Sequence, residues 1–188
     1  MIAASLGIAT IAVAAWVSRH RILEEYWLYR LRAGDAPLKA KAAARLGELG
    51  SRKAVPALLG AIREECVRAE EEASHQTGTD IGFDDGSFGF LVVVDGAEPF
   101  VDALIRIDEP ALPALIGSLG DRDTVYSSIC AGAIWALAET RGLTGSLRKP
   151  HFFRDIDCLP ILERLSEDGG CDEAVRQAAV AALKRVQE

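Results

Sequence analysis

Two stretches of this chain nearly repeat one another: KAVPALLGAI at Lys53–Ile62 and EPALPALIGSLGD at Glu109–Asp121. A looser copy, DCLPILERLSED, occupies Asp157–Asp168. Each copy has a proline near the start of an apolar segment, where a helix tolerates proline because the N–H groups of its first turn have no partner within the helix. Such repetition predicts one structural unit, used several times, that buries its apolar face against its neighbours.

Alanine-rich segments with helical spacing alternate with these copies. Aligned on one leucine in each, they lie 58, 33 and 46 residues apart, and the aligned residues are Leu46, Leu104, Leu137 and Leu183. With 33 residues as the period, the first interval carries about 25 extra residues and the last about 13. Both excesses coincide with glycine-containing irregular stretches, which we interpret as insertions at residues 77–97 and 141–154.

The repeats predict an all-α protein in which residues 35–188 form an α-solenoid of about 3.5 helix pairs. Residues 1–34 form a separate N-terminal segment. The expected helices of the solenoid cover residues 35–49, 52–75, 98–107, 110–119, 124–139, 156–166 and 173–186. Short polar side chains precede them as candidate N-caps, namely Asp35, Ser51, Asp108, Asp157 and Asp172.

Three stretches of the chain resemble HEAT repeats, in the short bacterial form also seen in phycobilisome-lyase-type HEAT proteins. They are DEAVRQAAVAALKRV at 172–186, AAARLGELGSRKAVPALLGAI at 42–62 and ALPALIGSLGDRD at 111–123. The resemblance covers residues 35–187 outside the two insertions and implies a stack of helix pairs that binds partners. It also implies an inter-repeat ladder of Asp and basic side chains, matched here by Asp35 with Lys39 and Asp172 with Arg176.

The first 17 residues, MIAASLGIATIAVAAWV, contain no charged side chain. As a helix they extend roughly 26 Å, the short end of what spans a bilayer core. We expect a transmembrane anchor; a cleaved secretory signal and a helix buried within the protein are the alternatives. Its large apolar side chains, which we assign to the lipid, are Ile2, Leu6, Ile8, Ile11, Val13, Trp16 and Val17.

The charges of the chain are unevenly divided. Residues 1–34 carry four Arg and two Glu, whereas the remainder carries 17 Lys and Arg against 26 Asp and Glu, so the chain as a whole is at −7. Since positive charge follows the apolar run and does not precede it, the positive-inside rule places the N-terminus outside and the body in the cytoplasm, as a single-pass membrane protein. An acidic body does not favour nucleic acid as a partner.

The first insertion contains DDGS at Asp84–Ser87 between two phenylalanine-rich segments, a pattern typical of a hairpin turn. A small hairpin-like element projecting from the helices is therefore expected. Its aromatic side chains either dock a partner protein or fill a gap between two repeats, and they are Phe83, Phe88 and Phe90.

The second insertion is basic and aromatic. Its candidate partner-binding residues are Arg148, Lys149, Phe152 and Phe153. Next to a membrane, such a loop suits anionic headgroups or an acidic protein; the alternative is a packed connector between helices.

Motifs of catalysis are absent from the sequence: there is no P-loop, no G-x-S-x-G, no H-E-x-x-H and no EF-hand spacing. We therefore expect no enzyme activity, cofactor or metal. The favoured function is a scaffold or accessory subunit that binds protein subunits of a membrane complex. The alternatives are a free-standing membrane adaptor that recruits soluble partners transiently and, more remotely, a lyase-like HEAT enzyme.

Overall fold

The computed structural model describes residues 19–76, 88–145, 147 and 157–187, and within these ranges it is helical and contains no strand. A helix covers residues 19–33. It is followed by α2 (Ala36–Glu48), a 3₁₀ turn η1 (Arg52–Ala54), α3 (Val55–Gln76), α4 (Phe88–Ile107), a 3₁₀ turn η2 (Glu109–Ala111), α5 (Leu112–Ser118), α6 (Thr124–Thr140), α7 (Leu159–Glu167) and α8 (Glu173–Gln187). The prediction of an all-α protein is confirmed for these residues.

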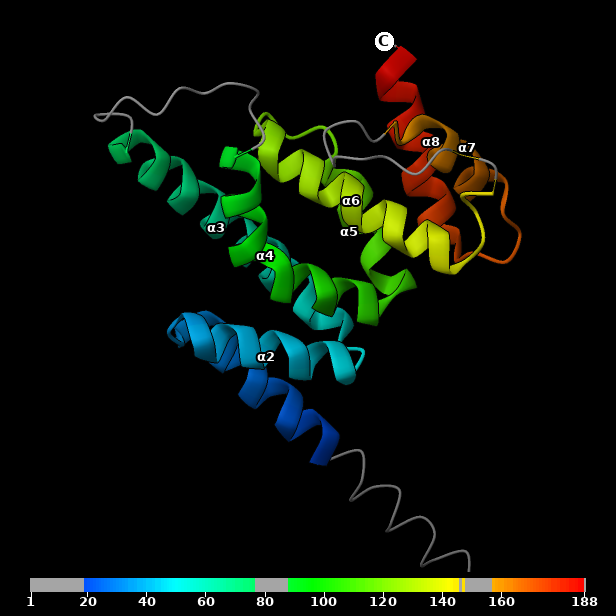
Figure 1. The fold of residues 1–188 in the computed structure, drawn as a ribbon. Coiled ribbons are helices and arrows are strands. Elements are labelled where there is room, and N and C mark those ends of the chain that lie inside the picture. Colours follow the sequence, from blue (N-terminus) through cyan, green and yellow to red (C-terminus); the bar gives the residue numbers. More distant parts are fainter. Residues whose placement is uncertain (1–18, 77–87, 146, 148–156, 188) are drawn as a thin grey trace, which may run out of the picture.

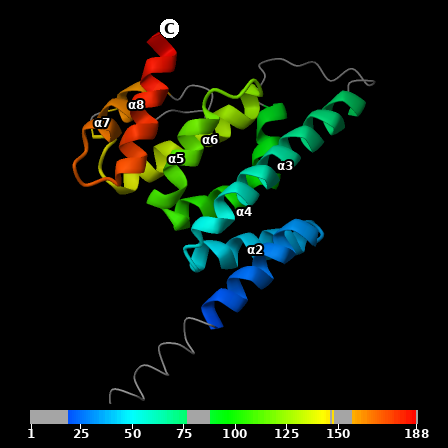
Figure 2. The same ribbon diagram turned by 180° about the vertical axis from the view of Figure 1, so that it is seen from behind.

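The helices stack in chain order from one end of the molecule to the other. The helix at 19–33 and α2 form the lower end in Figure 1, and α7 and α8 form the upper end; the reverse view agrees (Figures 1 and 2). Helix α4 packs against both α2 and α3, α6 packs against α4 and α5, and α8 packs against α7 and α5. This succession of layered helices is compatible with an α-solenoid.

One continuous apolar core runs through the stack. The aligned residues Leu46, Leu104 and Leu137 are all at most 1% exposed, and Leu183 packs partly buried against the same core. The repeat spacing read from the sequence therefore identified equivalent buried positions. Ser51 is also buried, and its hydroxyl donates to Glu24 Oε1 at 2.6 Å, which ties the N-terminal helix to the start of the solenoid.

The predicted helix boundaries agree with the structure within a few residues, except at α4. That helix begins at Phe88, ten residues before the predicted start at Glu98, so residues 88–97 are helical and belong to no hairpin. The prediction of a hairpin-like insertion over 77–97 is therefore wrong for residues 88–97, and residues 77–87 lie outside the described ranges. Pro99 lies inside α4. Val92–Val94 are therefore helical despite the strand propensity of valine.

Gly47 allows α2 and α4 to approach closely. A Cβ built at this position would lie 3.0 Å from Ala103 Cα and 3.2 Å from its carbonyl oxygen. Because both are backbone atoms, a side chain here must push the helices apart.

We expect Gly47→Val to destabilise the fold by about 1–3 kcal/mol, the usual cost of overpacking. The matched control is Gly60→Ala on an exposed turn of α3, where a Cβ meets nothing within 4 Å. This control should stabilise the protein by about 0.5–1 kcal/mol, since alanine is the better helix former. Urea unfolding followed by circular dichroism measures both. Equal effects of the two substitutions would contradict close packing at Gly47.

Candidate functional site

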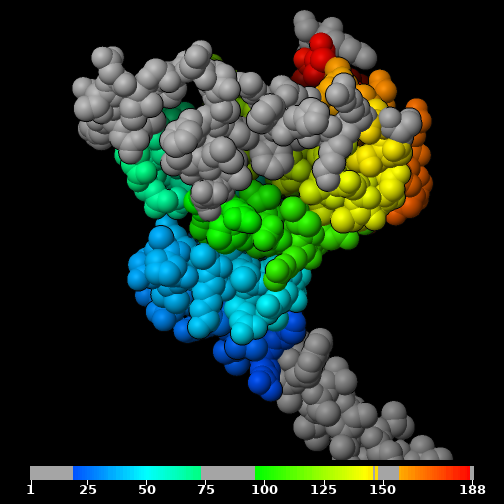
Figure 3. Space-filling view, viewed as in Figure 1, coloured from blue at the N-terminus to red at the C-terminus, as the bar shows by residue number. Residues whose placement is uncertain are grey.

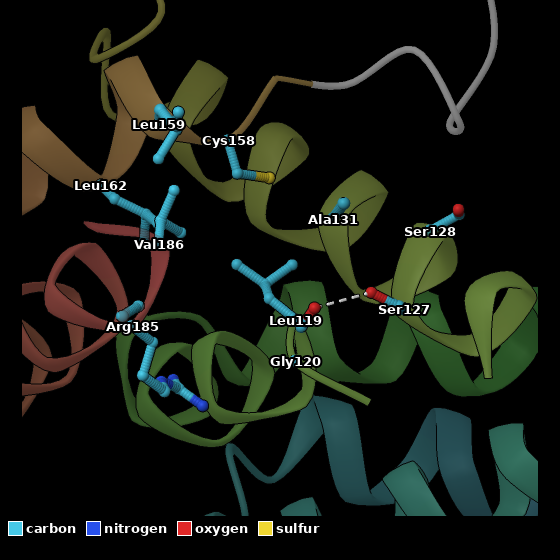
Figure 4. Close-up of a pocket in the computed structure, with 11 residues that line it drawn as sticks. Leu119, Gly120, Ser127, Ser128, Ala131, Cys158, Leu159, Leu162, Arg185 and Val186 are labelled. Carbon is cyan, nitrogen blue, oxygen red and sulfur yellow. Dashed lines mark hydrogen bonds between the residues drawn. The ribbon is translucent and has the colours of Figure 1, made fainter. Parts of the chain in front are cut away.

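An open groove of about 420 Å³ lies at the C-terminal end of the stack. Its walls come from the turn that follows α5, the first half of α6, the start of α7 and the last turns of α8. In Figure 4, Leu119, Leu162 and Val186 converge at one end of the groove, and Ser127 and Ser128 lie at the other. The groove is thus apolar at one end and hydroxyl-lined at the other.

The apolar end of the groove is open to solvent. Val186 is 62% exposed and Leu159 is 37% exposed, although both are large apolar side chains. In a stacked-repeat protein, each pair of helices covers the apolar face of the pair before it, and the last pair has no successor. The exposure therefore follows from the position of α7 and α8 at the end of the described stack.

Positive charge borders the groove. Lys184 and Arg185 occupy the last turn of α8, where cations are favoured by the helix dipole. The Arg185 guanidinium lies beside Gly120, and a Cβ at that glycine would be 3.3 Å from Arg185 Nη1 (Figure 4). The Ser127 hydroxyl is already used, since it donates to the Leu119 carbonyl at 3.0 Å. The groove therefore offers an apolar floor and a basic rim.

A second exposed apolar surface lies at the opposite end, on the helix at 19–33. The inner face of this helix is fixed to the body by buried Leu28 and Leu31. On the outer face, Ile22, Tyr26 and Tyr29 are 69%, 44% and 65% exposed. Figure 3 shows this helix, in dark blue, at the lower end of the described surface. A helix with apolar residues on two opposite faces is typical of one that contacts something on both sides.

Successive repeats are joined through their loops by one arginine. Arg141, at the end of α6, contacts Asp108 at 3.4 Å and Glu109 at 2.9 Å, about one repeat earlier in the chain. Glu109 also accepts the backbone N–H of Asp172, before α8. The expected ladder is different in the structure: Lys39 pairs with Glu64, and Arg176 pairs with Glu173 of its own helix.

This loop network predicts a pH-dependent contribution to stability. The Asp172 N–H and the Arg141 guanidinium hold the pKa of Glu109 below its usual 4.5. A carboxylate whose pKa is lowered by folding stabilises the fold above its unfolded-state pKa, and this contribution is lost as the pH falls through the folded-state value.

We expect Glu109→Gln to lower the free energy of unfolding by about 1–2 kcal/mol at pH 7 and by much less at pH 3. Urea titrations at both pH values measure the difference. Glu163→Gln, at an exposed site on α7, is the control and should stay within about 0.5 kcal/mol at either pH. A Glu109→Gln effect that does not change with pH would exclude the charged pairing.

The cysteines do not form a reactive centre. All four are free thiols, and Cys66, Cys130 and Cys171 are buried. Burial raises the pKa of Cys66 and Cys158 to about 12 and that of Cys130 and Cys171 to about 11. At neutral pH each is therefore a protonated, weakly nucleophilic thiol. Among the described residues, no group of His, Cys, Asp or Glu is arranged to hold a metal ion.

Most residues predicted to bind partners or lipid fall outside the described ranges. These are the anchor residues Ile2, Leu6, Ile8, Ile11, Val13, Trp16 and Val17, together with Phe83, Arg148, Lys149, Phe152 and Phe153. Phe88 and Phe90 lie in the first turn of α4. None of the helices described here combines the length and the hydropathy needed to cross a bilayer.

The sequence analysis did not identify the groove. Leu159 and Val186 fall in segments predicted as helices of the solenoid, where an apolar residue is expected to be buried. Their position in the final helix pair was the available signal.

Comparison with known proteins adds no relative: no family model, curated protein or solved structure matches the chain.

Proposed function

We propose that this chain is a membrane-anchored helical-repeat scaffold, an accessory subunit that binds a protein partner of a membrane complex. The observation that carries the proposal is the pair of exposed apolar surfaces at the two ends of the stack. Grouped exposed apolar side chains, such as Val186 with Leu159 and Tyr29 with Ile22, mark surfaces that contact another molecule.

The N-terminal end supports attachment to the bilayer. The uncharged Met1–Val17 segment directly precedes Arg19 and Arg21, an order typical of an anchor whose basic end stays in the cytoplasm. The helix at 19–33 then connects that segment to the body through the Ser51–Glu24 bond and the Lys53–Glu25 pair at 3.2 Å. The proposed anchor is thereby joined to the helical body by a packed helix and not by a loose linker.

The C-terminal groove supports recognition of a protein. Its occupant is an amphipathic helix of the partner that places two or three apolar side chains against Leu119, Leu162 and Val186. An acidic side chain at the edge of that helix complements Arg185, which makes the contact specific and steers the encounter. The groove is open to solvent and serine-lined at its other end, which suits a peptide surface better than a small hydrophobic ligand.

Photo-crosslinking from the groove tests the proposal. A photoreactive amino acid replaces Val186 in the full-length chain, which is then irradiated in its native membrane. We expect one discrete protein adduct that is reduced at least about ten-fold by Arg185→Glu, since bringing two like charges together in a contact costs several kcal/mol. The control places the same amino acid at Val67, which is 47% exposed on α3 and outside the groove. Equal adducts from both positions, or adducts to lipid alone, would contradict a protein-binding groove.

A further inference from the structure

The outer face of the helix at 19–33 has the spacing of a coiled-coil seam. The residues on this face, Ile22, Tyr26, Tyr29 and Ala33, recur at intervals of four, three and four, the pattern of alternating d and a positions of a heptad. All four are exposed. The opposite face carries the buried Leu28 and Leu31, so the helix packs on the body and still presents this short seam, from Ile22 to Ala33, outward.

We propose that this outer seam docks against the same seam of a second copy of the chain, with the two helices parallel. The parallel arrangement rests on the proposed anchor, because two copies inserted in one membrane leave it in the same direction. A seam of two heptads is marginal for association in water, and confinement to one bilayer raises the effective concentration of the second copy.

The charges beside the seam favour a second copy. With Tyr26 at an a position, Glu25 occupies g and Arg30 occupies e. In a parallel pair, a g residue faces the e residue five positions later in the other helix, so Glu25 of each copy faces Arg30 of the other. The two-fold symmetry of the dimer makes this pair twice.

Both members of this pair lie beside the seam, and Glu25 is also paired with Lys53 of its own chain. The Glu25 side chain is 66% exposed, and its neighbour Lys53, at 3.2 Å, is 60% exposed. The Arg30 guanidinium lies over the Tyr26 ring, 5.5 Å from its centroid, and Arg30 Nε is buried without a hydrogen-bond partner among the described residues. Arg30 is thus held beside the seam by the aromatic ring.

A lipid surface is the less suitable occupant of this seam. From Ile22 to Ala33 the helix rises about 16 Å, whereas the headgroup layer of one leaflet is only about 5–8 Å thick. A helix lying flat in that layer normally has basic residues along both sides of its apolar face. Here the side that carries the basic Arg32 also carries the acidic Glu25.

Disulfide crosslinking of the full-length chain in its membrane tests the seam. Tyr29→Cys places a thiol at a d position, and Arg21→Cys places one at an exposed position away from the seam. Both are made with Cys158→Ala, which removes the native thiol that is not fully buried. Under mild oxidation we expect Tyr29→Cys to form a covalent dimer of twice the 20.2 kDa chain mass, and Arg21→Cys to form at least about ten-fold less.

Charge reversal makes the test specific. Adding Arg30→Glu to Tyr29→Cys should reduce the dimer about five-fold, and adding Glu25→Arg as well should restore most of it, since each interhelical pair contributes modestly. Circular dichroism of each variant checks that the helices are intact. Equal dimer from Tyr29→Cys and Arg21→Cys, or a Tyr29→Cys adduct with a different protein, would overturn the proposal.

The same samples separate the seam from the anchor. If alkaline extraction releases the chain but the Tyr29→Cys dimer persists, the anchor is wrong and the seam is supported. If the chain stays in the membrane without forming that dimer, and the thiol introduced at position 29 is shielded from a water-soluble maleimide, lipid covers the face and the seam is overturned.

Discussion

We expect deletion of Met1–Val17 to release the protein from the membrane. We expect the full-length chain to remain in the membrane pellet after alkaline extraction and the shortened chain to appear in the supernatant, a shift in partition of at least about a hundred-fold. The reason is the removal of 17 consecutive uncharged residues. The described core is formed by side chains from Leu28 onward, so the shortened chain should keep its helical circular dichroism and its cooperative melting.

Point substitutions in the same segment serve as controls for the deletion. Ile11→Leu should leave the full-length chain in the pellet, whereas Ile11→Asp should weaken its retention, since a charged residue at the centre of a spanning helix costs about 2.5–3.5 kcal/mol. Release of the unmodified chain by alkaline extraction would refute the anchor. Retention of the shortened chain would mean that another part of the protein attaches to the membrane.

Leu104→Ala should lower the free energy of unfolding by about 2–5 kcal/mol, because it leaves a cavity at a site that cannot collapse freely. Leu104 is 0% exposed on α4, the helix that packs against both α2 and α3. For a domain with a typical stability of about 5–15 kcal/mol, this is a large fraction of the total. Urea unfolding in mild detergent, followed by circular dichroism, measures the loss.

Val67→Ala is the matched control for Leu104→Ala. Val67 also lies on a helix of the stack, but it is 47% exposed, and its truncation should change stability by less than about 0.5 kcal/mol. A loss below about 1 kcal/mol for Leu104→Ala would contradict a single cooperative core that passes through α4.

The repeat spacing was sufficient to predict most of the helices because the same buried position recurs in each unit. Leu46, Leu104 and Leu137 were aligned by sequence alone and are all buried. Local signals were less reliable in the first insertion. The valines at 92–94 suited a hairpin strand, yet they lie within α4.

Capping residues show the same limit of local reasoning. Asp35 caps α2 as predicted, since its carboxylate accepts the Leu38 N–H at 3.2 Å. Ser51 also precedes a helical turn, but its hydroxyl bonds Glu24 of the N-terminal helix. Asp108 adopts φ 66° and contacts Arg141. The sequence alone does not show that Ser51 meets Glu24, 27 residues away, or that Asp108 meets Arg141, 33 residues away.

The candidate sites were harder to predict than the fold because they consist of apolar side chains that no neighbouring helix covers. The apolar side chains of Val186 and Tyr29 resemble core residues in sequence, and only their places in the stack leave them exposed. The basic and aromatic residues that were predicted to bind partners lie mostly in the two insertions, outside the described helices.

The central claim is that the N-terminal segment holds the helical body at the cytoplasmic side of the membrane. Protease protection in sealed native membrane vesicles tests this claim most directly. An epitope tag at the C-terminus reports the fate of residues 19–188. Protease added to vesicles whose cytoplasmic face points outward should remove the tag. In vesicles of the opposite orientation the tag should survive the protease, and the tagged chain should then stay in the membrane pellet during an alkaline wash. Loss of the tag in the second preparation, or loss of the whole chain in the wash, would contradict the account.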